Sequence, residues 1–582
     1  MLDKAITERI EDYKKKERNQ KFLKELDLLI SSNDEKALYE RFYKDLSFGT
    51  AGLRGAIGAG TNRMNSFVVS KATQGMANYL IKTFPQKAKS GELKAVIAYD
   101  SRHDSALFAK NAALIFAGNN IMCYLFSSMR ATPELSFAIR KLKCETGIVI
   151  TASHNPPEYN GYKAYWVDGV QISSPHDELI TEEVKNVKSI SYMEEKEALQ
   201  KGLLKIIDKE LDELYIAFLL SLVKEKEAIN KTKNNLKIVY TPLHGVGSPF
   251  VERVMKEMGF NLFTVPEQRE GDGSFPTVSY PNPEDPLALK LAIEYASKEK
   301  ANLIMATDPD ADRFACGVSD DEGKMHLLTG NQIGVLFFDY ICQTKLKNIK
   351  APCVVRSIVT THMVDKIAKA HNVKLIECLT GFKWICGVQE KLEKEKNYTY
   401  VFGFEESFGY NFGGDVRDKD GIAASLLFAE LISYWKFQNV SILQRLDKLF
   451  MEYGVFEELT ISKTYKGSEG VSIMQGIMER VRKTRFSKIA NINVLKIRDV
   501  LESYEYFFES EKKEKIALPK SNVLQYFMEE GSIISVRPSG TEPKIKAYII
   551  AFEKNDDLAK AKRDAKNKVR EYEVFLNELL EM

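Results

Sequence analysis

The sequence predicts an α/β protein with three similar α/β domains, each a mixed sheet flanked by helices, and a C-terminal α+β domain around a central cleft. Its 582 residues are too many for one hydrophobic core. Three segments repeat one order of short apolar runs and helical patterns, and their last runs end in "SHNPP", "DPDADR" and "GFEESFG". Because ligands gather beyond the carboxyl ends of strands, we expect these loops to face one cleft.

The repeats begin at Leu93, Leu236 and Ala351 with apolar, β-rich runs that indicate buried strands. Helical patterns separate the runs, as in "TPELSFAIRKLK", where Thr132 is a possible N-cap. From about Ser462 the pattern changes to strand, helix, several strands and a long charged helix, which indicates the α+β domain. We expect four domains, at residues 1–220, 221–325, 326–455 and 456–582.

Charge and composition argue against nucleic-acid and membrane partners. Lys+Arg and Asp+Glu number 83 and 81, so no bulk charge attracts a polyanion. No run approaches the ~18 apolar residues of a membrane span. The first 26 residues predict a charged helix without the apolar core of a signal peptide. The seven cysteines form no CxxC pair, and we expect reduced thiols in a cytoplasmic protein.

The "DPDADR" loop predicts a metal site. Asp308, Asp310 and Asp312 follow an apolar strand at alternate positions, and three such carboxylates repel one another unless a cation lies among them. Oxygen ligands favour Mg²⁺ before Mn²⁺ or Ca²⁺. An EF-hand is excluded because Arg313 and Ser319 stand where that loop needs glycine and glutamate. The alternative, a solvated acidic turn, fits poorly after a buried strand.

Two further loops carry groups that bind phosphate. The segment "RPSGT" offers an arginine, two hydroxyls and a glycine, which can form a phosphate cradle: Arg537, Ser539, Gly540 and Thr541. A surface turn remains an alternative. No GxxxxGK[ST] motif occurs, so a P-loop ATPase is excluded. We interpret "GTAGLRGAIGAG" as a flexible loop that carries Arg54 into a cleft.

The "GFEESFGY" loop contains a carboxylate and a hydroxyl, Glu405 and Ser407, which are typical acceptors for sugar hydroxyls. A capping turn explains them equally well. The preceding "TGFKW" segment adds candidate substrate contacts at Thr380, Gly381 and Lys383.

The stretch "TASHNPPEYNGYKAYW" contains the candidate reactive group. Ser153 is a weak nucleophile without a base, and neighbouring residues on a strand point apart, so His154 is not automatically that base. Without a GxSxG elbow or a Ser-His-Asp order, an acyl hydrolase is disfavoured. A phosphate carried on Ser153 fits better, with Arg54, Lys163 and Arg313 available to balance its charge.

These four motifs, "TASHNP", "DPDADR", "GFEESFG" and "RPSGT", resemble in kind and order those of the α-D-phosphohexomutase (phosphoglucomutase/phosphomannomutase) superfamily. "FGTAGLRG", "NGYKAYW", "DGVQISSPHD" and "RDKDG" resemble the branch of bacterial α-phosphoglucomutases and animal phosphopentomutase and glucose-1,6-bisphosphate synthase enzymes. The resemblance implies a phosphoserine at Ser153, which with the three aspartates binds one Mg²⁺ per chain. It also implies that Lys163 is a general acid/base and that Arg54 and Arg313 lie near the phosphoserine.

The resemblance further implies a phosphoglucomutase reaction between α-D-glucose 1-phosphate and glucose 6-phosphate, with glucose 1,6-bisphosphate as intermediate and activator. Phosphopentomutase, phosphomannomutase and glucose-1,6-bisphosphate synthase activities remain alternatives. Phe408 stands where many family sugar loops have a small residue, and Phe404 precedes the glutamate, so the preferred sugar stays open. Besides the phosphosugar we expect no nucleic-acid or membrane partner, and a monomer or weak homodimer.

Overall fold

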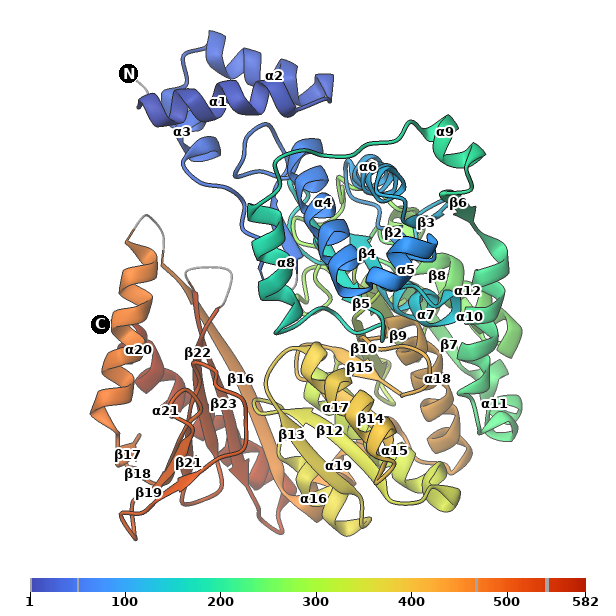
Figure 1. Ribbon diagram of the computed structural model, residues 1–582. Helices are drawn as coiled ribbons and strands as arrows, with labels where there is room; N and C mark the ends of the chain where they lie inside the picture. The colour runs from blue at the N-terminus through green and yellow to red at the C-terminus, as the bar shows by residue number, and fades with distance from the viewer. Residues whose placement is uncertain (1–2, 50–51, 466–468, 540–543, 582) are drawn as a thin grey trace. The chain divides into compact units, whose positions relative to one another are not determined.

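The structure is a computed structural model that describes residues 3–49, 52–465, 469–539 and 544–581 (Figure 1). The chain forms two compact units. Unit 1 consists of Met1–Ile333, Gln389–Lys394 and Ser407–Gln438, and unit 2 of Gly334–Val388, Glu395–Glu406 and Asn439–Met582. The third repeat therefore contributes to both units.

The N-terminal segment of unit 1 is a group of helices rather than the single helix that we expected: α1 (Lys4–Lys16), α2 (Gln20–Ser31) and α3 (Glu35–Phe42). The break falls at Glu17, whose buried carboxylate accepts a hydrogen bond of 3.0 Å from the backbone of Phe67. Asn19 then caps α2 by accepting from the Lys21 amide at 2.9 Å. Apolar side chains of all three helices join the core of the first domain, beside α4 in Figure 1.

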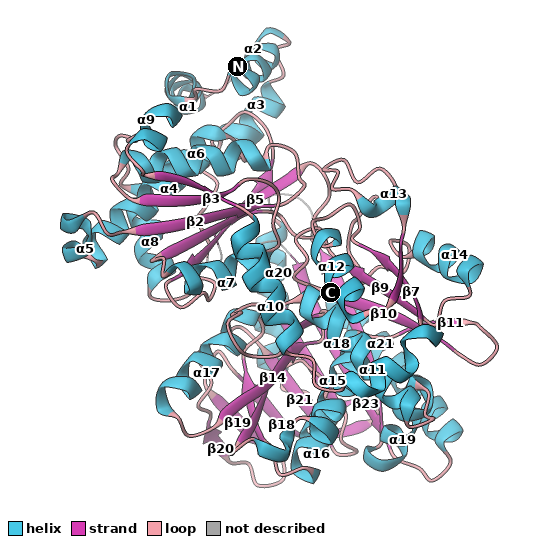
Figure 2. Ribbon diagram, turned by 90° about the vertical axis from the view of Figure 1, so that its right-hand side faces the viewer, coloured by secondary structure: helices cyan, strands magenta, loops and turns pink. Residues whose placement is uncertain are grey.

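The first sheet of unit 1 has six strands in the order β1-β5-β4-β2-β3-β6. Its strands are β1 (Gly52–Ala56), β2 (Lys94–Tyr99), β3 (Met122–Phe126), β4 (Thr146–Ile150), β5 (Tyr159–Trp166) and β6 (Leu204–Ile207). Its principal helices are α4 (Ser66–Thr83), α6 (Ser105–Gly118), α7 (Thr132–Leu142) and α8 (His176–Lys185). The β2-to-β3 and β3-to-β4 crossovers run in opposite directions, so right-handed connections place α6 and α7 on opposite faces (Figure 2).

The second sheet of unit 1 has the order β11-β10-β9-β7-β8. Its strands are β7 (Lys237–Thr241), β8 (Asn261–Thr264), β9 (Leu303–Thr307), β10 (Phe314–Ser319) and β11 (Met325–Leu327). Helices α10 (Lys209–Ser221) and α11 (Lys226–Thr232) lead into it, and α12 (Ser248–Met258) and α14 (Lys290–Glu299) cover it. Helix α18 (Gly421–Phe437), from the third repeat, packs against α11, α12, β9 and β10.

The third repeat has its strands in unit 2: β12 (Pro352–Ser357), β13 (Lys374–Cys378) and β14 (Thr399–Glu405). Both neighbours of β12 are parallel to it. In all three repeats the first strand lies between the third and the second, as β4-β2-β3, β9-β7-β8 and β14-β12-β13. This common topology confirms the repeat that the sequence predicts.

The C-terminal domain, also in unit 2, has an antiparallel sheet in the order β16-β23-β22-β21-β18-β19-β20, which ends in the short strands β19 (Tyr504–Phe507) and β20 (Lys513–Lys515). Its longest strands are β16 (Val455–Thr464), β18 (Ile492–Asp499), β22 (Ile533–Pro538) and β23 (Lys544–Glu553), and β21 spans Leu524–Met528. Helices α20 (Gly470–Thr484) and α21 (Leu558–Glu581) pack on it, which confirms the predicted α+β domain. The domain joins the third repeat through a hydrogen bond from Gln525 to the Ile358 carbonyl and a small shared apolar cluster.

All seven cysteines are free thiols, and six are buried. In the described part of the chain, no helix combines the length and the apolar character that crossing a bilayer requires.

Candidate active site

Ser153 lies on a tight turn directly after β4, at the carboxyl edge of the first sheet. Its backbone has a φ of 51°, which is uncommon for a non-glycine residue and takes the chain out of the extended strand conformation. The Ser153 amide donates to the Thr151 hydroxyl at 2.8 Å, and that hydroxyl donates to Asp100 at 2.6 Å. The serine is 4% exposed, so its hydroxyl is held within the protein.

Arg102 fixes the same turn, and the sequence reasoning missed it. Its guanidinium donates to the carbonyls of Ser153 and Pro156 at 2.6 and 2.8 Å, and also to those of Asn155 and Tyr159. One planar fork thus holds four carbonyls of the turn and of the start of β5. The arginine beside the strand end in "YDSR" is a signal that could have indicated this role.

The acidic cluster lies after β9 and contacts the serine. The Ser153 hydroxyl donates to Asp308 Oδ2 at 2.7 Å, while Asp308 Oδ1 accepts from the amides of Asp312 and Arg313 at 3.1 and 3.0 Å. Burial and the charges of Asp310 and Asp312 raise the pKa of Asp308. The structure therefore brings together the first two loops that we expected to share a site.

Lys163 lies on β5, opposite Gly52 of β1 and Val149 of β4. Its Nζ lies 2.6 Å from Asp310 Oδ2 and 3.1 Å from Asp312 Oδ2. Burial alone would lower the pKa of Lys163, but these two carboxylates outweigh it and raise that pKa above its ordinary value. Lysine and aspartates form one buried charged group, which sequence spacing alone could not establish.

Thr132, which we expected to cap a helix, instead contributes to the acidic cluster. The cap position of α7 is Ala131, and no side chain caps the helix there. The Thr132 hydroxyl donates to Asp310 Oδ2 at 2.7 Å. Burial would raise the pKa of Asp310, but Lys163 and this hydrogen bond help to lower it.

The "RDKDG" segment, Arg417–Gly421, is part of unit 1 and lies beside the cluster. Lys419 Nζ lies 3.1 Å from Asp312 Oδ2, Asp418 accepts from the Tyr165 hydroxyl at 2.6 Å, and Asp420 accepts from Tyr215. A Cβ at Gly421 would meet the Arg313 carbonyl at 2.4 Å, so only glycine permits this approach. Lys419 is a second cation at the aspartates; its motif was visible in the sequence, but its position was not.

The other groups predicted near Ser153 are Arg54, Arg313 and His154. Arg54 is on strand β1, not on the flexible loop that we expected, because this segment pairs with β5. The Arg54 side chain is exposed and donates a hydrogen bond to Asn155 Oδ1 at 3.2 Å. Arg313 pairs with Glu284. His154 Nδ1 lies 3.1 Å from Ser153 Oγ, so the two side chains do not point apart, because Ser153 is not in strand conformation.

The electrostatic state of His154 differs from that of its cationic neighbours. Loss of water contact, with the charges of Arg313 and Arg54, holds the pKa of His154 well below its ordinary value. The ring is therefore neutral at pH 7, and it packs edge-to-face against Tyr280 with the centroids 5.7 Å apart.

Unit 2 contains four of the candidate sugar-binding residues, Thr380, Gly381, Lys383 and Glu405. The Gly381 amide donates to Glu405 Oε1 at 2.6 Å, next to Thr380, whose shielded hydroxyl oxygen forms no hydrogen bond among the described residues. Lys383 lies in the first turn of α17 (Phe382–Glu395). Phe404 is fully buried and stacks on Phe402, so it is a core residue.

The other predicted residues lie on different segments of the chain. Ser407 belongs to unit 1, and the next residue, Phe408, has a φ of 63°. Arg537 lies near the end of β22, and the Ser539 amide donates to the Lys544 carbonyl at 2.7 Å. Gly540 and Thr541 lie outside the described residues. That all these loops face one cleft stays a prediction.

The aspartates of unit 1 fit a divalent cation. One carboxylate oxygen from each of Asp308, Asp310 and Asp312 lies within 4.8 Å of the others. The Oδ1 atoms of Asp310 and Asp312 are buried and accept no hydrogen bond within the described chain. Burying a carboxylate oxygen without a hydrogen-bond donor costs free energy of folding. A hard cation such as Mg²⁺ supplies the missing partner.

Comparison with protein families gives four matches along the chain. Models described as phosphoglucomutase/phosphomannomutase alpha/beta/alpha domains I, II and III match residues 45–191, 213–323 and 329–453. The model of the phosphoglucomutase/phosphomannomutase C-terminal domain matches residues 486–567.

Curated relatives include the phosphoglucomutase of Staphylococcus aureus strain MRSA252, 36% identical over 512 residues, which are 88% of this chain and 90% of that protein. The phosphoglucomutase of strain MSSA476 is 35% identical over 523 residues, 89% of this chain and 92% of its own.

Solved structures with the same fold include the open form of parafusin, a phosphoglucomutase of Paramecium, with a TM-score of 0.67 at 19% identity, over 93% of this chain and 95% of that one. A phosphoglucomutase/phosphomannomutase family protein of Burkholderia thailandensis has a TM-score of 0.62 at 16% identity, over 91% of this chain and 98% of that one.

Proposed function

Because the chain belongs to the phosphoglucomutase/phosphomannomutase family, and is therefore a phosphosugar mutase, we propose that it interconverts α-D-glucose 1-phosphate and glucose 6-phosphate. The hydrogen bond from Ser153 to Asp308 carries this proposal, because it joins the proposed phosphate carrier to the proposed metal ligands. The choice of glucose follows relatives named phosphoglucomutase at 35–36% identity.

In the proposed reaction, Ser153 carries a phosphoryl group in the resting enzyme. A hydroxyl oxygen of the sugar phosphate bonds to this phosphorus as the bond from phosphorus to Ser153 Oγ breaks. The hydroxyl loses its proton and Oγ gains one, with Lys163 as the proposed proton carrier. The product, glucose 1,6-bisphosphate, turns end for end and returns its other phosphoryl group to Ser153.

The chain's own residues supply charge and position. Mg²⁺, held by the three aspartates, would neutralise charge on the phosphoryl oxygens, one ion per chain. Arg54 and Arg313 add positive charge on the protein side, and neutral His154 offers a ring nitrogen near Oγ. Phosphoryl transfer needs mainly positioning and charge stabilisation, which these groups provide.

Two sets of residues are the proposed substrate contacts. The sugar hydroxyls would bind Thr380, Gly381, Lys383, Glu405 and Ser407. The phosphate that is not reacting would bind Arg537, Ser539, Gly540 and Thr541, since arginine and hydroxyl groups suit its oxygens.

The deciding experiment is Ser153→Ala with intact-mass measurement. We expect mutase activity to fall at least a thousandfold and the mass increment of one phosphoryl group to disappear. The control is Ser90→Ala, on an exposed turn of α5 (Pro85–Ser90), which should match the wild type. An active, unmodified Ser153→Ala protein would refute the mechanism.

A kinetic panel tests the substrate. We expect the highest kcat/KM with glucose 1-phosphate among the 1-phosphates of glucose, mannose, ribose and deoxyribose. A higher value with a pentose or mannose phosphate would replace the glucose assignment but keep the mutase. Turnover of glucose 1-phosphate that requires 1,3-bisphosphoglycerate would instead indicate a bisphosphate synthase.

A further inference from the structure

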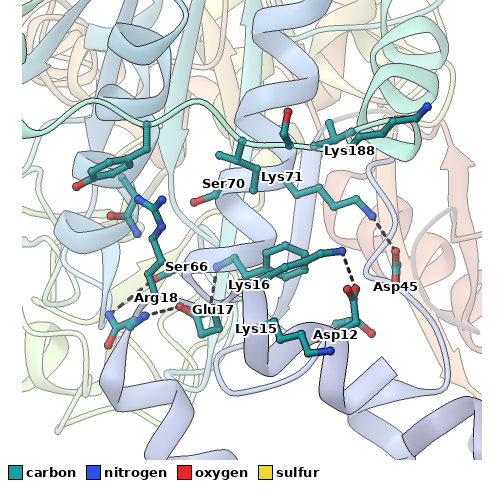
Figure 3. Close-up of a pocket in the computed structure, with 18 of the residues that line it drawn as sticks. Asp12, Lys15, Lys16, Glu17, Arg18, Asp45, Ser66, Ser70, Lys71 and Lys188 are labelled. Atoms are coloured by element: carbon teal, nitrogen blue, oxygen red, sulfur yellow. Dashed lines mark hydrogen bonds and ion pairs between the residues drawn. The ribbon is translucent and has the colours of Figure 1, made fainter. Parts of the chain in front are cut away.

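An open pocket of about 620 Å³ lies between the N-terminal helices and the first domain of unit 1 (Figure 3). Its walls come from α1, the α1–α2 connection, α4, α6 and the segment after α8. None of the proposed catalytic or substrate residues lines it. Residues 3–44, which build one wall, precede the first residue that the family model matches. The volume lies in the range of small-molecule sites.

The side chains that line the pocket carry a net positive charge. Six cationic and four acidic side chains line it, which leaves a net charge of +2. Two of the acids are paired: Asp45 with Arg9 and Lys71, and Asp12 with Lys16 at 2.7 Å.

Glu17, a third acid, is buried and turned into the protein. Its carboxylate accepts hydrogen bonds from the amides of Asn19 and Phe67 at 2.7 and 3.0 Å and from the Tyr13 hydroxyl at 3.2 Å. It therefore contributes little negative charge to the open part of the pocket.

Three of the cations have no carboxylate partner. Among the described residues, Lys15, Lys188 and Arg18 form no ion pair, and Arg18 instead stacks over the Tyr192 ring at 4.8 Å. They come from both walls, Lys15 and Arg18 from the N-terminal segment and Lys188 from the segment after α8 (Figure 3). An anion between the walls would meet positive charge from each side.

Neutral polar groups accompany these cations. The side chains of Ser70, Asn111 and Ser189 line the pocket and form no hydrogen bonds in the described chain. Hydroxyl and amide groups beside unpaired lysine and arginine suit phosphate oxygens and neighbouring hydroxyls. We propose that this pocket binds a phosphorylated small molecule at a site separate from the catalytic one.

The test is amide hydrogen exchange on the full-length protein with inorganic phosphate as the probe. Potassium chloride at equal ionic strength is the reference, because screening by salt affects all surface charges. We expect phosphate to slow exchange severalfold in peptides that cover residues 9–19 and 66–71. A phosphate bound at the proposed catalytic groups would protect other peptides, so the two sites are read separately.

The charge variant is Lys15→Gln/Lys188→Gln, and its control is Lys89→Gln/Lys226→Gln, which removes two exposed lysines outside the pocket. We expect the protection to disappear in the first variant and to persist in the second. Absence of protection in the wild type, or unchanged protection in the first variant, would overturn the proposal. Because no step uses turnover, either result leaves the proposed mutase reaction untouched.

Discussion

The hydroxyl of Ser153 donates a hydrogen bond of 2.7 Å to Asp308, although 155 residues separate the two in sequence. The two side chains follow β4 and β9, the last strands of the first and second repeats. Each repeat delivers its reactive loop at the equivalent edge, so the duplicated topology builds a single site from two domains.

Replacement of Asp310 by Asn should weaken metal binding. The change removes a negative charge from the cluster while keeping its size, so we expect the Mg²⁺ concentration for half-maximal activity to rise about tenfold or more. A magnesium titration of activity measures this. Asp321→Asn, in an exposed turn, is the control and should behave as wild type. An unchanged magnesium requirement in Asp310→Asn would remove this residue from the proposed ligand set.

Lys419→Met should reduce kcat more than it changes KM. Lys419 is 3.1 Å from Asp312, so its loss removes positive charge beside the reacting phosphoryl group without removing a proposed sugar contact. We expect kcat to fall at least tenfold, and Lys419→Arg to restore part of it. The control is Lys436→Met, because Lys436 lies in the last turn of α18, at the end away from Lys419. A change confined to KM would instead place Lys419 in substrate binding.

Arg102→Lys should loosen the serine turn. Lysine keeps the charge beside Asp100 but cannot donate to four carbonyls at once. We expect kcat to fall at least tenfold with a small change in KM, together with faster amide exchange around Ser153. Arg253→Lys, at an exposed position of α12, is the matched control. Wild-type kcat and exchange in Arg102→Lys would contradict a positioning role.

Asp420 should make stability depend on pH. Burial raises the pKa of Asp420 to about 6, above its ordinary value, so the folded protein holds this proton at a pH where the unfolded chain has lost it. The protonated Asp420 therefore adds to the free energy of unfolding below about pH 4. This contribution falls by at most about 3 kcal/mol as the pH rises to about 6.

Asp420→Asn tests this dependence, because the amide oxygen can still cap α18 but does not titrate. We expect the Tm of the variant, relative to wild type, to rise between about pH 4 and pH 6.5. Differential scanning calorimetry across this range measures it, with Asp321→Asn as control. A Tm difference that is constant over the range would show that Asp420 has an ordinary pKa.

The sequence by itself determined the repeat and the loops that carry chemistry. Apolar runs that end in polar, Gly- and Pro-marked loops predict buried strands and their carboxyl ends, and the strand orders confirm the three equivalent α/β repeats. The alternating carboxylates Asp308, Asp310 and Asp312 indicated a metal site, because their mutual repulsion is a local property of the sequence.

Only the tertiary structure decided which distant groups complete this site. Arg102, Thr132 and Lys419 reach Ser153 or the aspartates from other elements, and neither local periodicity nor spacing encodes such contacts. Arg54 is on a strand for the same reason, since pairing with β5 outweighs the flexibility of its neighbouring glycines. Local sequence sets the strand and loop pattern, whereas the charges and hydrogen bonds of a buried site depend on how the chain packs.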